Sequence, residues 1–160
     1  MRVSAQLVIA CVILAGCQRD PFSDQYTTSR PREEEVIGQY TFSRDTVTWG
    51  KSAAIKSCRL ELRADGTFVA TNLPRAEFPG RGSDYLGDVV NASGKWRIDS
   101  VGGGEDWRGR ILTHWGLYFD ATSANLNIQR AGFTGHKPPY GLIFSFDDPD
   151  RGMAVFLRKN

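Results

Sequence analysis

The sequence lacks most of the signals from which a biochemical function is usually inferred. Its 160 residues carry a formal net charge of only +2, so nothing indicates the strongly basic domain expected of a nucleic-acid-binding protein. It has no His-x-Glu-x-x-His or Cys–His set that would hold zinc. It also has no Gly-x-Ser-x-Gly elbow and no phosphate-binding glycine loop ahead of a helix. We therefore do not expect an enzyme, and we expect no cofactor.

Histidines and clustered aspartates are the remaining candidates for chemistry. His114 alternates with apolar neighbours on a predicted strand, so we expect a surface or hydrogen-bonded strand residue, and His136 falls in a predicted loop. The aspartates between 147 and 150 are dense enough to suggest calcium. However, Asp, Pro and Gly also build turns, and no further acceptor follows at an EF-hand spacing. The sequence therefore predicts no metal site.

No apolar run reaches the length of about 20 residues that a bilayer-spanning helix needs. The longest run, from Val3 to Gly16, is interrupted only by Ser4 and Gln6 and is preceded by Arg2. A short apolar core with a basic start and a small-residue end is typical of a cleaved secretion signal, whereas a buried N-terminal helix is the alternative. We expect residues 1–16 to be removed.

The end of this run carries a specific motif. Leu14-Ala15-Gly16-Cys17 resembles the lipobox of bacterial lipoproteins. The resemblance implies cleavage before Cys17, a diacylglyceryl group on its thiol and an acyl chain, such as palmitate, on the new amine. Two or more chains anchor a protein stably to a membrane. Cys11 competes as an acylation site, but it has no leucine at the lipobox position and would leave a very short apolar core.

The residue after the lipobox bears on location. Gln18 stands where lipoproteins of Gram-negative bacteria that stay in the inner membrane tend to have aspartate. The resemblance therefore implies a lipid-anchored protein of the cell envelope, at the outer membrane facing the periplasm if the organism is Gram-negative. With Cys11 removed and Cys17 acylated, Cys58 would be alone, so no intramolecular disulfide is expected.

Composition divides the mature chain into a tether and one domain. Residues 17–35 are polar, contain Pro21 and Pro31 and end in the charged run Arg30–Glu35, which predicts a flexible tether. Residues 36–160 are long enough for one domain with a single core. The sequence thus predicts a signal peptide over 1–16, a tether over 17–35 and a folded domain over 36–160.

Period-2 alternation dominates this domain and predicts strands. Leu60 and Leu62 share one strand face, and Asp65-Gly66 is a strong hairpin turn. Residues 46–56 have room for a helical turn or two, and residues 72–92 form a long connection. About eight strands with hairpin links predict an all-β, antiparallel up-and-down β-barrel, with a β-sandwich as the alternative. The strands are expected at 36–43, 59–64, 67–71, 95–98, 110–119 (one bent strand or a pair), 125–130, 140–146 and 153–159.

Several strand-and-turn motifs suggest a family resemblance. Gly38-Gln39-Tyr40 resembles the Gly-x-aromatic opening of lipocalin-like barrels. Further motifs are similar to a pattern found in small uncharacterised bacterial secreted proteins. These are Leu62-Arg63-Ala64-Asp65-Gly66-Thr67-Phe68, Gly94-Lys95-Trp96, Pro138-Pro139-Tyr140-Gly141-Leu142 and Asp147-Asp148-Pro149-Asp150-Arg151-Gly152. The resemblance implies a lipocalin-like barrel and says little about function.

Aromatic side chains in predicted loops are the candidate contacts with a ligand or a partner. Trp49 and Trp107 fall in loops, and Phe78 and Tyr85 lie in the 72–92 connection. Two hypotheses follow for a protein attached to a membrane through its lipid. The barrel binds a small apolar or amphiphilic ligand, or it is a protein–protein interaction module such as an envelope inhibitor, an immunity protein or an assembly factor.

Overall fold

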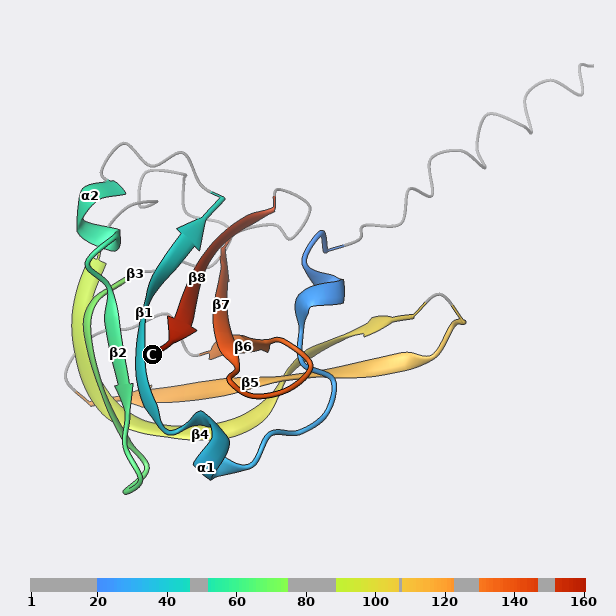
Figure 1. The fold of residues 1–160 in the computed structure, drawn as a ribbon, viewed down its shortest axis with the longest axis horizontal. Coiled ribbons are helices and arrows are strands. Elements are labelled where there is room, and N and C mark those ends of the chain that lie inside the picture. Colours follow the sequence, from blue (N-terminus) through green and yellow to red (C-terminus); the bar gives the residue numbers. More distant parts are fainter. Residues whose placement is uncertain (1–19, 47–51, 75–88, 107, 123–129, 147–151) are drawn as a thin grey trace, which may run out of the picture.

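The fold is a closed antiparallel β-barrel of eight strands. The computed structural model describes residues 20–46, 52–74, 89–106, 108–122, 130–146 and 152–160 (Figure 1). Each strand pairs with the next along the chain and the last pairs with the first, which confirms the predicted up-and-down barrel over the sandwich. The strands are β1 (Gly38–Asp45), β2 (Arg59–Leu62), β3 (Thr67–Pro74), β4 (Val89–Glu105), β5 (Ile111–Ala121), β6 (Arg130–Thr134), β7 (Gly141–Phe146) and β8 (Met153–Lys159).

Helix is scarce in the described residues. A 3-10 turn, η1 (Ser23–Gln25), and a short helix, α1 (Glu33–Val36), precede the barrel, and α2 (Ser52–Ile55) lies within the 46–56 segment predicted to hold helical turns. None of the described helices is long and apolar enough to cross a bilayer.

The hairpin of β2 and β3 shows how local sequence builds the sheet. Gly66 takes φ +78°, a conformation open to glycine. Asp65 Oδ1 accepts hydrogen bonds from the backbone N–H and the hydroxyl of Thr67, at 2.9 and 2.6 Å. The resulting register pairs Leu62 with Phe68. The turn therefore brings apolar side chains of both strands to the same, inner face.

The inner face of the barrel forms one hydrophobic cluster. Phe68 and Phe119 meet edge to face with ring centroids 5.0 Å apart, and the Trp96 indole N–H donates to the Arg63 carbonyl at 3.1 Å. Burying each large apolar side chain contributes about 1.5–3 kcal/mol. The barrel members of the cluster are Tyr40, Leu60, Leu62, Phe68, Ala70, Leu73, Ala92, Trp96, Ile98, Leu117, Phe119, Ala131, Phe133, Leu142, Phe144, Val155 and Leu157.

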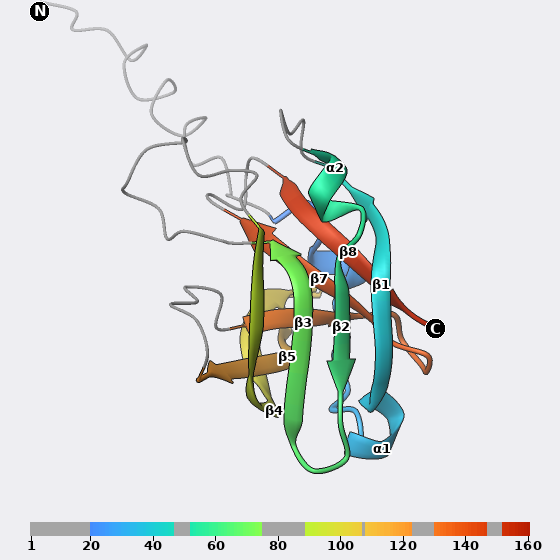
Figure 2. The same cartoon turned by 90° about the vertical axis from the view of Figure 1, so that its left-hand side faces the viewer.

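Helix α1 lies across one end of the barrel (Figures 1 and 2). Val36 is fully buried, and its carbonyl accepts a 2.7 Å hydrogen bond from the Tyr40 hydroxyl. The Lys159 ammonium donates to the Glu35 carbonyl at 2.7 Å. The first and last strands are thus both tied to this helix.

Strands β4 and β5 continue beyond the barrel as a two-stranded ribbon (Figure 1). Pairing of β3 with β4 ends at Thr67–Lys95, whereas β4 and β5 stay paired as far as Glu105–Ile111. Residues 102–104, which lie outside every predicted strand, are therefore strand, and 110–119 holds one strand rather than two. The name ribbon is used below for Asp99–Glu105, Ile111–Trp115 and the described turn residues between them.

The segment ahead of α1 packs on the barrel, in contrast to the flexible tether that its composition predicts. Phe22 and Tyr26 are 7% and 8% exposed and cluster with Ile143, Ala154 and Phe156 on the outer side of β7 and β8. Two buried aromatic rings supply the apolar contact that a solvated tether lacks. The tether prediction therefore does not describe residues 20–35.

Thr27 joins this segment to the sheet at the place where β5 and β6 are no longer paired with each other, which is called the seam here. Its backbone N–H donates to the Phe133 carbonyl at 2.9 Å, and its own carbonyl accepts from the Trp115 N–H at 3.0 Å. Its hydroxyl donates to the Gly135 carbonyl at 2.6 Å, and the residue is 1% exposed. Because β5 and β6 share only three residue pairs, ending at Gly116–Gly132, Thr27 extends the hydrogen bonding of the seam.

Two predicted boundaries fall partly outside the described residues. A strand was expected at 125–130, and the structure begins β6 at Arg130. The predicted connection 72–92 contributes its first residues to β3 and its last to β4, while 75–88 lie outside the described chain.

Candidate functional site

All five residues that the sequence singles out as attachment or contact sites lie outside the described chain. They are Cys17, Trp49, Phe78, Tyr85 and Trp107. Their roles remain predictions, and the site must be sought among the residues that the structure places.

The described barrel interior is occupied by side chains. Every buried member of the interior cluster is at most 8% exposed, and the half-buried Phe42, Val90 and Trp115 pack against it. Small barrels are commonly filled in this way. The described part of the interior therefore forms a hydrophobic core.

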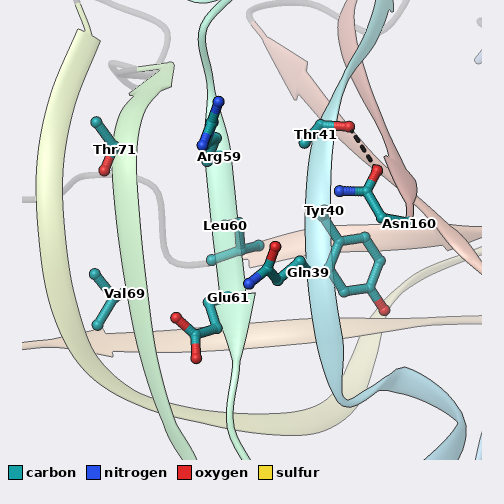
Figure 3. Close-up of a pocket in the computed structure, with 9 residues that line it drawn as sticks. All are labelled: Gln39, Tyr40, Thr41, Arg59, Leu60, Glu61, Val69, Thr71 and Asn160. Atoms are coloured by element: carbon teal, nitrogen blue, oxygen red, sulfur yellow. Dashed lines mark hydrogen bonds between the residues drawn. The ribbon is translucent and has the colours of Figure 1, made fainter.

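A depression of about 380 Å³ lies on the outer surface of β1, β2 and β3 (Figure 3). Tyr40 and Leu60 border it but are buried in the core, so the side chains that face solvent there are polar or small. At its edge the Thr41 hydroxyl donates to Asn160 Oδ1 at 2.9 Å. The outward-facing side chains are Gln39, Thr41, Arg59, Glu61, Val69 and Thr71.

A second depression, of about 510 Å³, adjoins the first across β3 and β4. Both are bordered by Val69, which is 37% exposed and is one of two large hydrophobic side chains exposed among the described residues. Together they make one surface, here named the β1–β4 face: Gln39, Thr41, Arg59, Glu61, Arg63, Thr67, Val69, Thr71, Ser93 and Lys95.

Charged side chains on and beside the β1–β4 face contact their strand neighbours. Arg63 Nε lies 3.1 Å from Glu61 Oε1, and this contact raises the pKa of the arginine. Hydrogen bonds from Thr67 lower the pKa of Asp65, which keeps that carboxylate charged. Arg59 has no ion-pair partner within the part of the chain that the structure describes. The face thus presents hydrogen-bonding groups and a free guanidinium around one apolar side chain.

Sequence reasoning places Arg59, Glu61 and Arg63 on the face opposite Leu60 and Leu62, but it does not identify this surface. Val69 was the available signal, because it points outward between the inward-facing Phe68 and Ala70. The two depressions form one surface because of the register in which β3 pairs with β4, and the sequence does not show this register.

The aspartates between 147 and 150 lie outside the described residues, and the other titratable groups considered from the sequence do not assemble into a reactive site in the part of the chain that the structure describes. His114 lies on a strand as expected, but it is not at the surface, because the side chain is 7% exposed and stacks on Tyr26. Burial lowers the pKa of His114, and His136 is exposed. Cys58 is 1% exposed and burial raises the pKa of its thiol to about 12, so it is unreactive. Among the described residues, no three potential metal ligands come together.

Comparisons with known proteins find no match: no protein family, no curated protein and no solved structure is similar to this chain. The described residues define a closed eight-stranded up-and-down barrel with an apolar interior.

Proposed function

We propose that the protein is a lipid-anchored protein of the cell envelope that binds another envelope protein through the β1–β4 face. The observation that supports this most is the position of Val69, an exposed apolar side chain between two adjoining depressions with polar borders. An apolar centre within a polar rim is the usual anatomy of a protein–protein contact.

The chemistry of the face indicates the kind of partner. A small apolar ligand needs an enclosed apolar cavity, whereas both depressions are open and have charged, hydroxyl and amide side chains among their lining residues. Arg59 and Lys95 add positive charge at opposite ends of the face. The expected partner surface therefore carries an apolar side chain to cover Val69, with carboxylates at its rim.

The anchor in this proposal is the diacylglyceryl group implied at Cys17, which would hold the barrel at a membrane. Attachment raises the local concentration of the barrel near partners in the same membrane, so a modest contact area is sufficient.

Site-specific photo-crosslinking in the native organism tests the contact surface. A photoreactive residue at Val69 is expected to give one discrete adduct, whereas the matched control at Lys137, an exposed residue between β6 and β7, gives none. The crosslinked protein is then identified, purified and titrated against the wild-type chain and Val69→Asp. We expect Kd to rise at least about tenfold for the variant.

Two results would contradict the proposal. One is equal crosslinking from Val69 and Lys137, which would show that the β1–β4 face is not a preferred contact surface. The other is a stoichiometric lipid that is extracted from purified wild type and from Val69→Asp alike, which would support the small apolar ligand.

A further inference from the structure

The chain joins the barrel surface only three residues after the implied lipid attachment. The Phe22 N–H donates to Asp20 Oδ1 at 2.8 Å, and Phe22 itself is 7% exposed against the barrel. A fully extended chain spans at most about 3.6 Å per residue, so Cys17 lies within roughly 11 Å of Asp20. A lipid at Cys17 therefore brings the bilayer within roughly that distance of Asp20.

The packed segment lies on the same side of the molecule as the ribbon. Its Tyr26 ring stacks on His114 of the ribbon at 4.5 Å, and the Arg30 guanidinium lies 5.2 Å from the ring centre of Trp115. Figures 1 and 2 show this segment on the side of the barrel away from β2 and β3. A bilayer close to Asp20 would therefore face the ribbon and leave the β1–β4 face turned away.

The ribbon exposes side chains that suit the boundary between water and lipid. Ile111 is 87% exposed, and Arg108 and Arg110 are exposed beside it. In such a contact an apolar side chain enters the acyl boundary, and long cationic side chains reach back to the headgroups. Ile111 and Val69 are the two exposed large hydrophobic residues of the described chain. The ribbon and β3, which carry them, lie on opposite sides of the barrel (Figure 1).

Two carboxylates lie at the end of the ribbon: Glu105, which is exposed and pairs directly with Ile111, and Asp106, which is satisfied by protein groups. Asp106 Oδ1 accepts hydrogen bonds from the backbone N–H groups of Arg108 and Arg110, both at 2.9 Å. Its Oδ2 lies 2.6 Å from Arg110 Nη2. Because Arg110 compensates Asp106, and Arg108 and Glu105 carry opposite charges, the described end of the ribbon has no net charge, and its contact with the bilayer rests on the exposed Ile111.

We propose that the ribbon is a second membrane contact, which together with the lipid at Cys17 holds the barrel in one orientation. Ile111 enters the interfacial region of the bilayer, and the β1–β4 face points away from the membrane toward its partner. This inference rests on the lipid anchor of the proposed function.

Fluorescence quenching on vesicles tests the orientation. The acylated protein carrying Ile111→Cys or Val69→Cys is labelled with an environment-sensitive fluorophore and bound to phosphatidylethanolamine–phosphatidylglycerol vesicles that contain brominated lipid. Cys58 is buried and should not be labelled in the folded protein. We expect quenching of the label at position 111 and none at position 69.

A longer connection provides the matched control. Inserting about twelve Gly and Ser residues after Arg19 adds a mean reach of about 20 Å. Flotation with the vesicles should persist, while the quenching at position 111 is lost.

The outcomes separate this inference from the anchor on which it rests. Failure of the acylated fraction to float with vesicles would overturn the anchor itself. Flotation with equal quenching at both positions, or quenching that survives the longer connection, would overturn the fixed orientation and leave the anchor standing.

Discussion

The ring of Tyr26 lies flat on the imidazole of His114, with centroids 4.5 Å apart and planes 7° from parallel. The Tyr26 hydroxyl forms a 3.0 Å hydrogen bond with the hydroxyl of Ser145 in β7. One side chain of the N-terminal segment therefore contacts two strands on either side of β6. This contact makes residues 20–37 part of the fold, and it places the start of the packed chain beside the ribbon.

Removing the Tyr26 ring should destabilise the barrel strongly. Tyr26→Ala leaves an unfilled space over β6, and the expected loss is about 3–5 kcal/mol in the free energy of unfolding. Tyr26→Phe removes only the hydroxyl that bonds Ser145, at a cost of about 1 kcal/mol. Urea unfolding of the three proteins measures both values. A loss below about 1 kcal/mol for the alanine variant would show that the segment is not part of the stable fold.

Gly132 should be required beneath the tyrosine ring. A Cβ at this position would lie 2.6 Å from Tyr26 Cδ1, closer than packed carbon atoms allow, so Gly132→Ala must displace the ring. Overpacking of this kind costs about 1–3 kcal/mol. In the Tyr26→Ala background the same change should cost much less, since the ring is absent. A double-mutant cycle by urea unfolding measures this coupling, and strict additivity of the two losses would contradict the contact.

His114 should make stability depend on pH in the mildly acidic range. Burial lowers the pKa of His114 in the folded state, so the unfolded state binds a proton more readily than the folded state does. The free energy of unfolding therefore falls as the pH drops through the ordinary histidine pKa of about 6.5. The free energy of unfolding is compared at pH 7.5 and 5.5 for the wild type and His114→Gln. We expect the free energy of unfolding to fall less between pH 7.5 and 5.5 in the variant than in the wild type. An equal decrease in both proteins would show that His114 does not cause the pH dependence.

Cys58 should be unreactive in the folded protein. The side chain is 1% exposed, and burial raises the pKa of its thiol to about 12, so almost no thiolate forms at pH 8. A chromogenic disulfide reagent should label this thiol in urea and not in buffer. Rapid labelling under native conditions would show that the α2 end of the barrel opens readily.

Local sequence predicts the barrel well where a strand has a clear inner and outer side. Leu60 and Leu62 alternate with charged residues, and Asp65-Gly66 forms the turn that it predicts. Prediction fails at residues 102–104, because three glycines carry no side chains from which alternation can be read. There the ladder depends on the opposite strand, in which His114, Thr113 and Leu112 supply the pairing.

The packed N-terminal segment was beyond sequence prediction for a different reason. Phe22 and Tyr26 are too few to make a pattern, and their burial depends on a flat area of the barrel. That area forms because Gly116 and Gly132 are paired across β5 and β6. Gly116 and Gly132 come together only when the barrel forms. The residues of the β1–β4 face around Val69 likewise come together only when their strands pair.

The lipid at Cys17 is the claim on which both the partner-binding role and the orientation at the membrane depend. Mass spectrometry of the N-terminal peptide, taken from the protein in the membrane fraction of its own organism, tests it directly. The account predicts a chain that begins at Cys17 and carries a diacylglyceryl group on the thiol. A chain that begins at Met1, or one with an unmodified Cys17, would contradict it.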